Sequence, residues 1–248
     1  MKHLKKFENH TKYELASQNL ILPNVSLCEQ ENEVHYKPYV DPYNGHAYVD
    51  LGLPSGTKWA TMNVGATKPE EYGLYFAWGE RQGYAADQVG SGEGKKAFKW
   101  SDYKWSDNGS SSVMTKYNAT DGKTVLDLED DAAAANWGGK WKMPTEAQWR
   151  ELFNTANCTN TWVSNYNGSG INGRLFTSVS NGNTLFLPAA GFCSGGSVIS
   201  VGSDGNVWAS SLNSSYVSSA WGITFRSNGG GVFNDGRYYG FSVRGVIG

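Results

Sequence analysis

Side chains that could act as nucleophiles or metal ligands are few and widely spaced along this 248-residue chain. Its three cysteines, Cys28, Cys158 and Cys193, include no C-x-x-C pair, and this pattern predicts neither a disulfide framework nor a zinc site. All four histidines precede Ala47, without a His-x-x-x-His pair. Zinc catalysis therefore has no ligands, and a serine hydrolase has no histidine base in the rest of the chain. We expect no enzymatic activity.

One segment gathers carboxylates that could hold Ca²⁺ through oxygen atoms, namely Asp127, Glu129, Asp130 and Asp131. Four alanines and then two glycines follow, and acidic residues before such a run complement the dipole of a helix start. The pattern predicts a short helix over Leu126–Asn136. We expect no cofactor; a structural Ca²⁺ at these carboxylates is the alternative to a charge cluster at the helix start.

A second helix is predicted from Thr145, which forms a capping box with Gln148. The apolar residues that follow lie at i, i+3, i+4 and i+7, as one stripe: Trp149, Leu152, Phe153 and Ala156. The rest of the chain consists of short apolar or alternating runs separated by glycine turns, which favours strands and long loops. Two short helices among many strands predict an α+β domain.

The C-terminal quarter has an unusual composition. From Leu187 to Gly248 there is no Lys, Glu, Gln or Met, whereas the preceding 186 residues hold 15, 12, 5 and 4 of them. Strand propensity disfavours Lys and Glu but does not explain the missing Gln and Met. Codons of the form NNY encode none of these residues, nor Trp or stop. Asparagine codons randomised at their adenines would become NNY codons and would produce this restricted set of amino acids. Trp208 and Trp221, which NNY codons do not encode, would then be fixed positions.

The residues Trp221–Arg226 alternate in a way that supports this interpretation. On a strand, Trp221, Ile223 and Phe225 would face the core, while Gly222, Thr224 and Arg226 would face the other side. The second set shares no chemistry. We therefore expect it to tolerate substitution, whereas Trp221→Ala should cost about 3–5 kcal/mol as a core truncation.

Four motifs carry a resemblance to a known family. They are Val49-Asp50-Leu51-Gly52-Leu53-Pro54-Ser55-Gly56-Thr57-Lys58-Trp59-Ala60, Trp141-Lys142-Met143-Pro144-Thr145, Leu185-Phe186-Leu187-Pro188-Ala189-Ala190-Gly191 and Arg237-Tyr238-Tyr239-Gly240-Phe241-Ser242-Val243-Arg244. Residues 48–248 resemble the Fibrobacter major paralogous domain of gut Bacteroidales and their phages, which is similar to the formylglycine-generating-enzyme branch of the C-type lectin fold. The C-terminal segment resembles the variable region of diversity-generating retroelement target proteins. Gly245 stands where such domains often have Pro.

This resemblance implies a C-type lectin fold and a ligand-binding surface rewritten by adenine-directed mutagenesis. Carried over by position, the displayed side chains are Phe192, Ser194, Ile199, Ser200, Asp204, Asn206, Val207, Tyr216, Ser218, Gly222, Thr224, Arg226, Phe233, Asn234, Asp235 and Tyr239. The implied scaffold is Trp208, Ser210, Trp221, Phe225, Arg237, Phe241 and Arg244. Tyr, Phe and Arg among small polar residues resemble an antibody paratope, in which aromatics supply rigid contact area.

The resemblance also suggests two other functions, an enzymatic activity and calcium-dependent sugar binding. A formylglycine-generating enzyme needs a reactive cysteine pair, and only Cys193 lies in the C-terminal quarter. Calcium-dependent sugar binding would use Glu-Pro-Asn or Gln-Pro-Asp where this chain has Leu187-Pro188-Ala189. The predicted function is therefore non-catalytic receptor binding, as a bacteriophage virion adhesin. The alternatives are a bacterial surface lectin-like protein of fixed specificity and, third, a formylglycine-generating-type enzyme.

Domain organisation and partners follow from the same features. Residues 1–47 are expected to be an attachment or assembly arm, and 48–248 the binding domain, with 187–248 variable. The net charge of −2 predicts no affinity for nucleic acid, and no apolar run approaches the ~20 residues of a membrane span. The N-terminus predicts no signal peptide, which agrees with a phage tail or fibre protein released by lysis or with a cell-surface protein whose leader was lost. The expected partner is a host-cell receptor, protein or glycan. The sequence leaves the oligomeric state open: the resemblance suggests a homotrimer, and the arm is a candidate for assembly.

Overall fold

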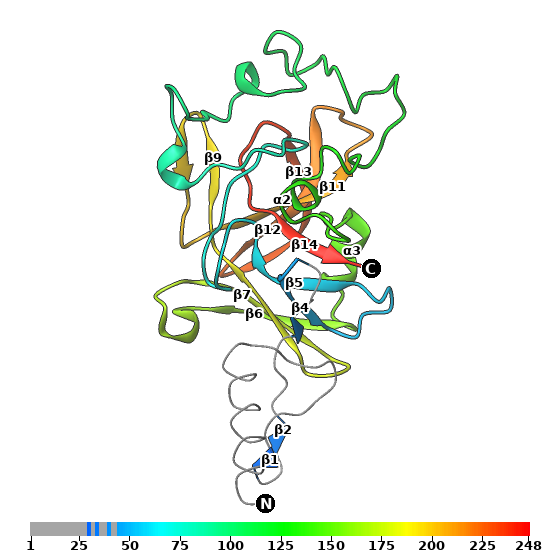
Figure 1. Cartoon of the computed structure of the whole chain (residues 1–248), viewed down its shortest axis with the longest axis vertical. Helices are drawn as coiled ribbons and strands as arrows, with labels where there is room; N and C mark the ends of the chain where they lie inside the picture. Colours follow the sequence, from blue (N-terminus) through cyan, green and yellow to red (C-terminus); the bar gives the residue numbers. More distant parts are fainter. Residues whose placement is uncertain (1–28, 31–32, 35–38, 41–43) are drawn as a thin grey trace, which may run out of the picture.

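A computed structural model describes residues 29–30, 33–34, 39–40 and 44–248 (Figure 1). The expected attachment arm, residues 1–47, therefore lies mostly outside the described residues. Within it, β1 (Glu29–Gln30) pairs with β2 (Glu33–Val34). The short strand β3 (Tyr39–Val40) pairs with β4 (Ala47–Asp50), the first strand of the main body. The end of the arm thus joins a sheet of the domain.

That sheet has four antiparallel strands in the order β14-β5-β4-β3. One of its two inner strands, β5 (Lys58–Asn63), pairs with β14 (Arg244–Ile247), the last strand of the chain. Trp59 of β5 is fully buried and its ring lies 4.4 Å from that of Trp149. The motifs at the two ends of the predicted domain therefore meet in one sheet.

Two further antiparallel units precede the C-terminal sheet. β6 (Cys158–Val163), β7 (Gly173–Ser178) and β8 (Thr184–Pro188) form a three-stranded meander. β9 (Phe192–Ser194) and β10 (Ser197–Ile199) form a hairpin. Its two loop residues, Gly195 and Gly196, have φ angles of 59° and 87°. A two-residue loop with positive φ at both positions is the turn whose twist matches paired strands, and glycine adopts it without strain.

The C-terminal sheet consists of β11 (Gly205–Leu212), β12 (Ser219–Arg226) and β13 (Gly229–Gly236), with β12 in the centre. Its two faces contribute to different hydrophobic clusters. Val207 and Ile223 pack with Trp59 and Trp149 on one side, whereas Trp208 and Ala220 belong to the cluster on the other. This part of the sheet is therefore covered on both faces, so that side chains on its strands here are buried whichever way they point.

The helices are short. α2 (Ala132–Trp137) begins after Asp131, whose carboxylate accepts a hydrogen bond from the amide of Ala134, and ends at Gly138 with φ of 67°. α3 (Glu146–Phe153) has the predicted capping box of Thr145 and Gln148. It packs against β11, β12 and β13. The 3₁₀ turns are η1 (Ala86–Gln88), η2 (Trp100–Asp102) and η3 (Tyr166–Gly168).

The fold class predicted from the sequence is wrong. The described residues contain two α-helices of six and eight residues, whereas their strands form several small antiparallel sheets of two to four strands. The domain is therefore mostly β rather than α+β, and its small separate sheets do not support the C-type lectin fold that the resemblance implied. The first helix is shorter than predicted because Asp131, in an extended backbone conformation, is its N-cap, so the residues from Leu126 to Asp130 precede the helix. The second ends at Phe153, so Ala156 is exposed beyond it.

Candidate binding surface

The side chains predicted to form a binding surface lie on three connected parts of the fold. Phe192 and Ser194 belong to β9, and Ile199 ends β10. Most of the others lie on β11, β12 and β13 or in the loop between β11 and β12. The segment after β13 carries Tyr239. Figure 1 shows β9 on one side of the C-terminal sheet, and the backbones of Cys193 and Gly240 exchange two hydrogen bonds that tie these parts together.

A half-exposed aromatic group forms the centre of this surface. The ring of Phe192 meets that of Tyr239 edge to face, with centroids 5.8 Å apart. Tyr239 also packs against Tyr238 at 4.2 Å. Beneath them, Phe241 is buried and stacks on Trp208 at 4.1 Å. The outer rings therefore rest on a buried aromatic layer that holds them in place, which is how rigid aromatic contact residues are presented at binding surfaces.

Polar groups border the aromatic rings. Burial raises the pKa of the Tyr238 hydroxyl, and its hydrogen bond with Tyr239 adds to that effect, while Ser194 opposes it. Burial also raises the pKa of Asp235, although the amide of Gly236 donates to its carboxylate at 2.7 Å and acts in the opposite direction. The result is a surface of phenyl rings, hydroxyls and one partly desolvated carboxylate.

The strand register divides the remaining predicted residues. Phe233 lies opposite Gly222 and Asp235 opposite Ala220, whereas Asn234 lies opposite Trp221. Because side chains alternate along a strand, Asn234 points to the other face, towards the side of α3. Thr224 and Arg226 share the face of Phe233. Both lie near the C-terminal end of β12. Arg226 is the last residue of the strand, about 23 Å from its first residue, Ser219, at ~3.3 Å per residue.

Other exposed side chains extend the surface beyond the aromatic rings, and one of them, Ile199, lies directly opposite Phe192 in the β9–β10 hairpin. Tyr216, in the loop between β11 and β12, is 69 % exposed, and Ile199 is 38 % exposed. Arg226 forms an ion pair with Asp204, with Nη2 and Oδ2 2.8 Å apart. Ser218 and Ser200 are half-buried in the connecting loops. The predicted residues thus line an elongated surface rather than one compact patch.

Four predicted surface residues are buried and cannot belong to it. Asp204, Asn206 and Val207 are 7 %, 5 % and 2 % exposed, and Gly222 is also buried. Val207 packs in the cluster around Trp59. A Cβ added to Gly222 would lie 2.6 Å from the carbonyl oxygen of Val207 on the paired strand. Asn206, Val207 and Gly222 are buried for one reason, because both faces of the sheet are covered at this point; Asp204 directly precedes β11, and its carboxylate pairs with Arg226.

The predicted scaffold is buried with one exception. The residues that are fully or almost fully buried are Trp208, Ser210, Phe225, Arg237, Phe241 and Arg244. Arg244 donates to Asn63 Oδ1 and to the carbonyl oxygen of Ala60, at 3.0 and 2.8 Å. Trp221 is only half-buried, at the edge of its cluster, and the Arg150 guanidinium lies 5.4 Å from its ring centroid.

Two aromatic residues of the surface were missed. Tyr238 directly precedes the predicted Tyr239, so the Tyr238-Tyr239 pair itself was an available signal. Trp100 lies far away in sequence, in η2, yet its ring is 4.8 Å from that of Tyr238. Nothing in the local sequence around Trp100 indicates this long-range contact.

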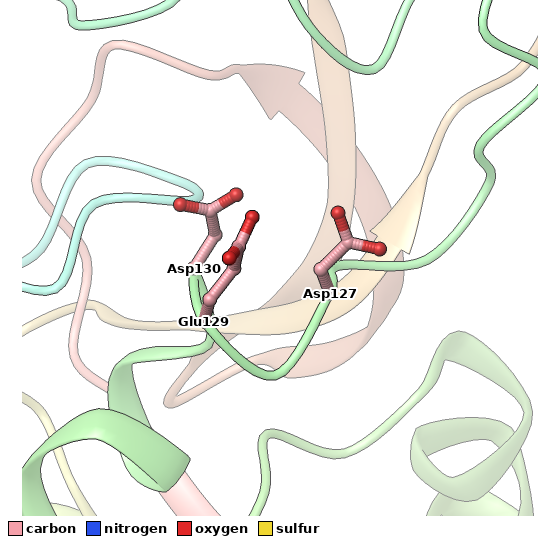
Figure 2. Close-up of side chains that lie close together, drawn as sticks. All are labelled: Asp127, Glu129 and Asp130. Atoms are coloured by element: carbon pink, nitrogen blue, oxygen red, sulfur yellow. The ribbon is translucent and has the colours of Figure 1, made fainter.

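The acidic group offers no open metal site. Figure 2 shows the carboxylates of Asp127, Glu129 and Asp130 pointing to the same side of the turn that precedes α2. The ammonium group of Lys116 lies 2.8, 3.0 and 2.6 Å from their oxygens. A lysine therefore occupies the position that a cation would take among these three carboxylates. Asp131 is apart from them, because it caps α2.

The cysteines in the described part of the chain are buried free thiols, Cys158 and Cys193. Burial raises the pKa of Cys158 to about 11 and also raises that of Cys193. Since the thiolate is the reactive form, neither thiol is an activated nucleophile at neutral pH. An open polar pocket of about 430 Å³ lies elsewhere, lined by Glu80, Arg81, Gln82, Lys104, Ala135 and Asn136.

No family model, curated protein or solved structure proves similar to this chain. The family resemblance therefore rests on the sequence motifs alone. Among the described residues, none of the helices has the length and apolar character needed to cross a membrane.

Proposed function

We propose that this chain is a non-catalytic receptor-binding protein whose C-terminal surface is diversified by a retroelement. The proposal rests on one combined observation. The segment Leu187–Gly248 lacks Lys, Glu, Gln and Met, and within it the large side chains divide into a buried framework and a half-exposed aromatic surface. Such a division is what a diversified protein needs, because the surface can change while the framework keeps the fold.

The mechanism is surface recognition. Phe192, Phe233 and Tyr239 supply rigid apolar area, and Thr224 and Asp235 supply hydrogen-bonding groups at the same face of the sheet. Aromatic residues dominate the energy of most protein interfaces, because they bury a large area at a low cost in side-chain entropy. The partner is a receptor on a host-cell surface, and the proposed carrier is the virion of a phage of gut Bacteroidales, with this chain as a tail or fibre adhesin.

The distribution of chemistry supports a binding role. The thiols of Cys158 and Cys193 are buried, and the carboxylates near α2 are already neutralised by lysines. The surface itself contains no pair of groups with the arrangement of a nucleophile and its base among the described residues. Binding by shape and hydrogen bonds is the chemistry that remains.

Sequencing the locus and its downstream flank from many related phages or genomes tests the proposal. We expect substitutions confined to NNY codons at exposed positions such as Thr224, Phe233 and Tyr239, beside a near-copy template and a reverse transcriptase gene. Codons for Val207, Gly222 and Phe225 should stay constant. A C-terminal segment that changes no faster than residues 48–186, without such a cassette, would instead indicate a surface protein of fixed specificity.

The carrier is tested separately by mass spectrometry of purified particles. The virion assignment expects this chain in intact particles. Its presence only in the outer membrane or cytosol of uninfected cells would contradict that assignment. The binding function would then still be tested by sequencing the locus.

A further inference from the structure

A segment outside the C-terminal quarter contacts the aromatic surface directly. It runs from Lys96 to Trp105 and contains Phe98, which is fully buried with φ of 50°. A bulky residue seldom adopts this left-handed backbone conformation, so the surrounding contacts must hold it there. The ring of Phe98 packs over Gly240, where an added Cβ would lie 2.6 Å from the ring and 2.7 Å from Cβ of Cys193.

The backbone of this segment holds the β9–β10 hairpin. The carbonyl oxygen of Phe98 accepts a hydrogen bond from the amide of Gly195 at 3.2 Å, and that of Ala97 accepts one from Gly196 at 2.6 Å. The amide of Cys193 in turn donates to Gly240 at 2.8 Å. All three bonds join main-chain atoms, so they do not depend on which side chains β9 and β10 carry.

The same segment also holds the tyrosine pair. Trp100 packs on Tyr238 and, at 5.7 Å, against Tyr103. The Tyr103 hydroxyl donates to the carbonyl oxygen of Trp78 at 2.8 Å and accepts a hydrogen bond from Arg237. Trp100 is thus fixed from behind by the buried framework, and Tyr238 rests on it.

A buried ion pair closes the segment at both ends. The ammonium group of Lys96 donates to both Glu80 oxygens, at 2.9 and 2.7 Å, and to the carbonyl oxygen of Asp102 at 2.6 Å. Glu80 Oε1 also accepts a hydrogen bond from the amide of Lys104 at 2.9 Å. Both side chains are less than one-tenth exposed. The pair therefore fixes the start of the segment, through Lys96, and its end, through Asp102 and Lys104.

We infer that Glu80 and Lys96 are positioning residues, which hold the segment Lys96–Trp105 as the constant half of the binding surface while the C-terminal half varies. This inference rests on the proposed function. Replacing a buried ion pair by apolar residues of similar volume often leaves stability unchanged or higher. Global stability alone would therefore not explain why this pair is charged. The four directed hydrogen bonds of the pair, two within it and one each to Asp102 and Lys104, fix a geometry that an apolar pair would leave free.

The test is amide hydrogen exchange on the double variant Glu80→Leu/Lys96→Met, with no ligand present. We expect exchange at Gly195, Gly196 and Gly240 to become about tenfold faster or more, while β12 amides and the unfolding midpoint change little. The matched control, Asp50→Asn/Lys58→Met, removes an exposed ion pair (3.8 Å) on β4 and β5 and should leave the hairpin unchanged. If amide exchange became faster by the same factor in β12 and in the hairpin, the pair would be merely structural and the inference would be overturned. Unchanged exchange in the hairpin would also overturn it.

A second variant keeps the test decisive if the double variant does not fold. Trp100→Ala leaves the buried charges in place and removes the support of Tyr238 together with the edge contact to Tyr103. We expect faster exchange at Tyr239 and Gly240, with β12 unaffected; unchanged rates at both amides would overturn the constant-half assignment. Because no ligand is used, this outcome is independent of the locus sequencing that tests the proposed function.

Discussion

The guanidinium of Arg237 is fully buried and lies 4.7 Å from the ring centroid of Trp78, and its hydrogen-bond partners among the described residues include no carboxylate. Its donors reach backbone oxygens of Lys116, Tyr117 and Val217 and the hydroxyl of Tyr103, at 2.8–3.0 Å. Burial lowers the pKa of Arg237, and Tyr103 opposes this shift. One side chain of the C-terminal quarter therefore joins the loops that precede α2 to the sheet that carries the binding surface.

Arg237→Met should lower the free energy of unfolding by about 3–5 kcal/mol, because it leaves several buried carbonyl groups without a donor. Urea unfolding measures the change. Arg150→Met is the control, since Arg150 is exposed and pairs with Glu146 on the surface of α3, and it should cost less than about 1 kcal/mol. Similar losses for both variants would contradict the structural role assigned to Arg237.

Features set by neighbouring residues could be predicted from the sequence. The capping box of Thr145 and Gln148 is confirmed, and so is the glycine end of α2, because both depend on a few adjacent residues. The alternation around Trp221 correctly placed Ile223 and Phe225 in the core. Each of these features depends on residues that are only a few positions apart in the chain, so the sequence alone was sufficient to predict it.

Features set by distant packing could not be predicted. Alternation indicates which residues share a face of β12, but it does not indicate that Trp208 and Phe241 cover the second face. This is why Gly222 was misplaced on the surface. The contact of Trp100 with Tyr238 likewise joins segments that only the tertiary fold brings together. The fold class was wrong for a different reason: both helices and the many strands were predicted, but two helices of six and eight residues are too small a share of the domain to define an α+β class.

Gly222→Ala should destabilise the protein by about 1–3 kcal/mol, in contrast to the tolerance expected from sequence alone. An added Cβ would lie 2.6 Å from the carbonyl oxygen of Val207 on the paired strand, where the backbone cannot yield cheaply. Gly231→Ala on the neighbouring β13 is the matched control, because nothing lies within 4 Å of its Cβ position. Thermal unfolding of both variants measures the difference; an equal midpoint would contradict the close approach of β11 and β12.

Phe225→Ala should cost more than Trp221→Ala, although tryptophan is the larger residue. Phe225 is completely buried, so its truncation should cost about 3–5 kcal/mol. Trp221 is half-buried at the edge of the same cluster, so we expect roughly 1–2 kcal/mol, less than its sequence position indicates. Chemical denaturation of the two variants under identical conditions gives the order, and the reverse order would place Trp221 in the core after all.

Stability should fall as the pH drops from about 5 towards 2. Hydrogen bonds from Lys116 and Lys123 lower the pKa of Asp127 from 3.8 to about 2. Because the folded-state pKa lies below the unfolded value, the stabilisation is present above the unfolded pKa and is lost as the pH falls through the folded one. Asp127→Asn should flatten the dependence of the urea midpoint on pH in this range. Asp87→Asn, at an exposed position on η1, should leave it unchanged, and an unaltered slope for Asp127→Asn would contradict the lysine contacts.

Millimolar Ca²⁺ should leave the thermal unfolding midpoint of the protein unchanged, and so should a chelator. The ammonium group of Lys116 already lies within 3.0 Å of oxygens from all three carboxylates near α2, and a divalent ion would have to displace it. Lys116→Met removes that competitor and leaves the acidic group unneutralised at its centre. We expect the variant to be less stable and to regain part of the loss when Ca²⁺ is added, since an ion that binds only the folded state stabilises it. A midpoint of the unsubstituted protein that rises with Ca²⁺ would show that lysine does not fill the site.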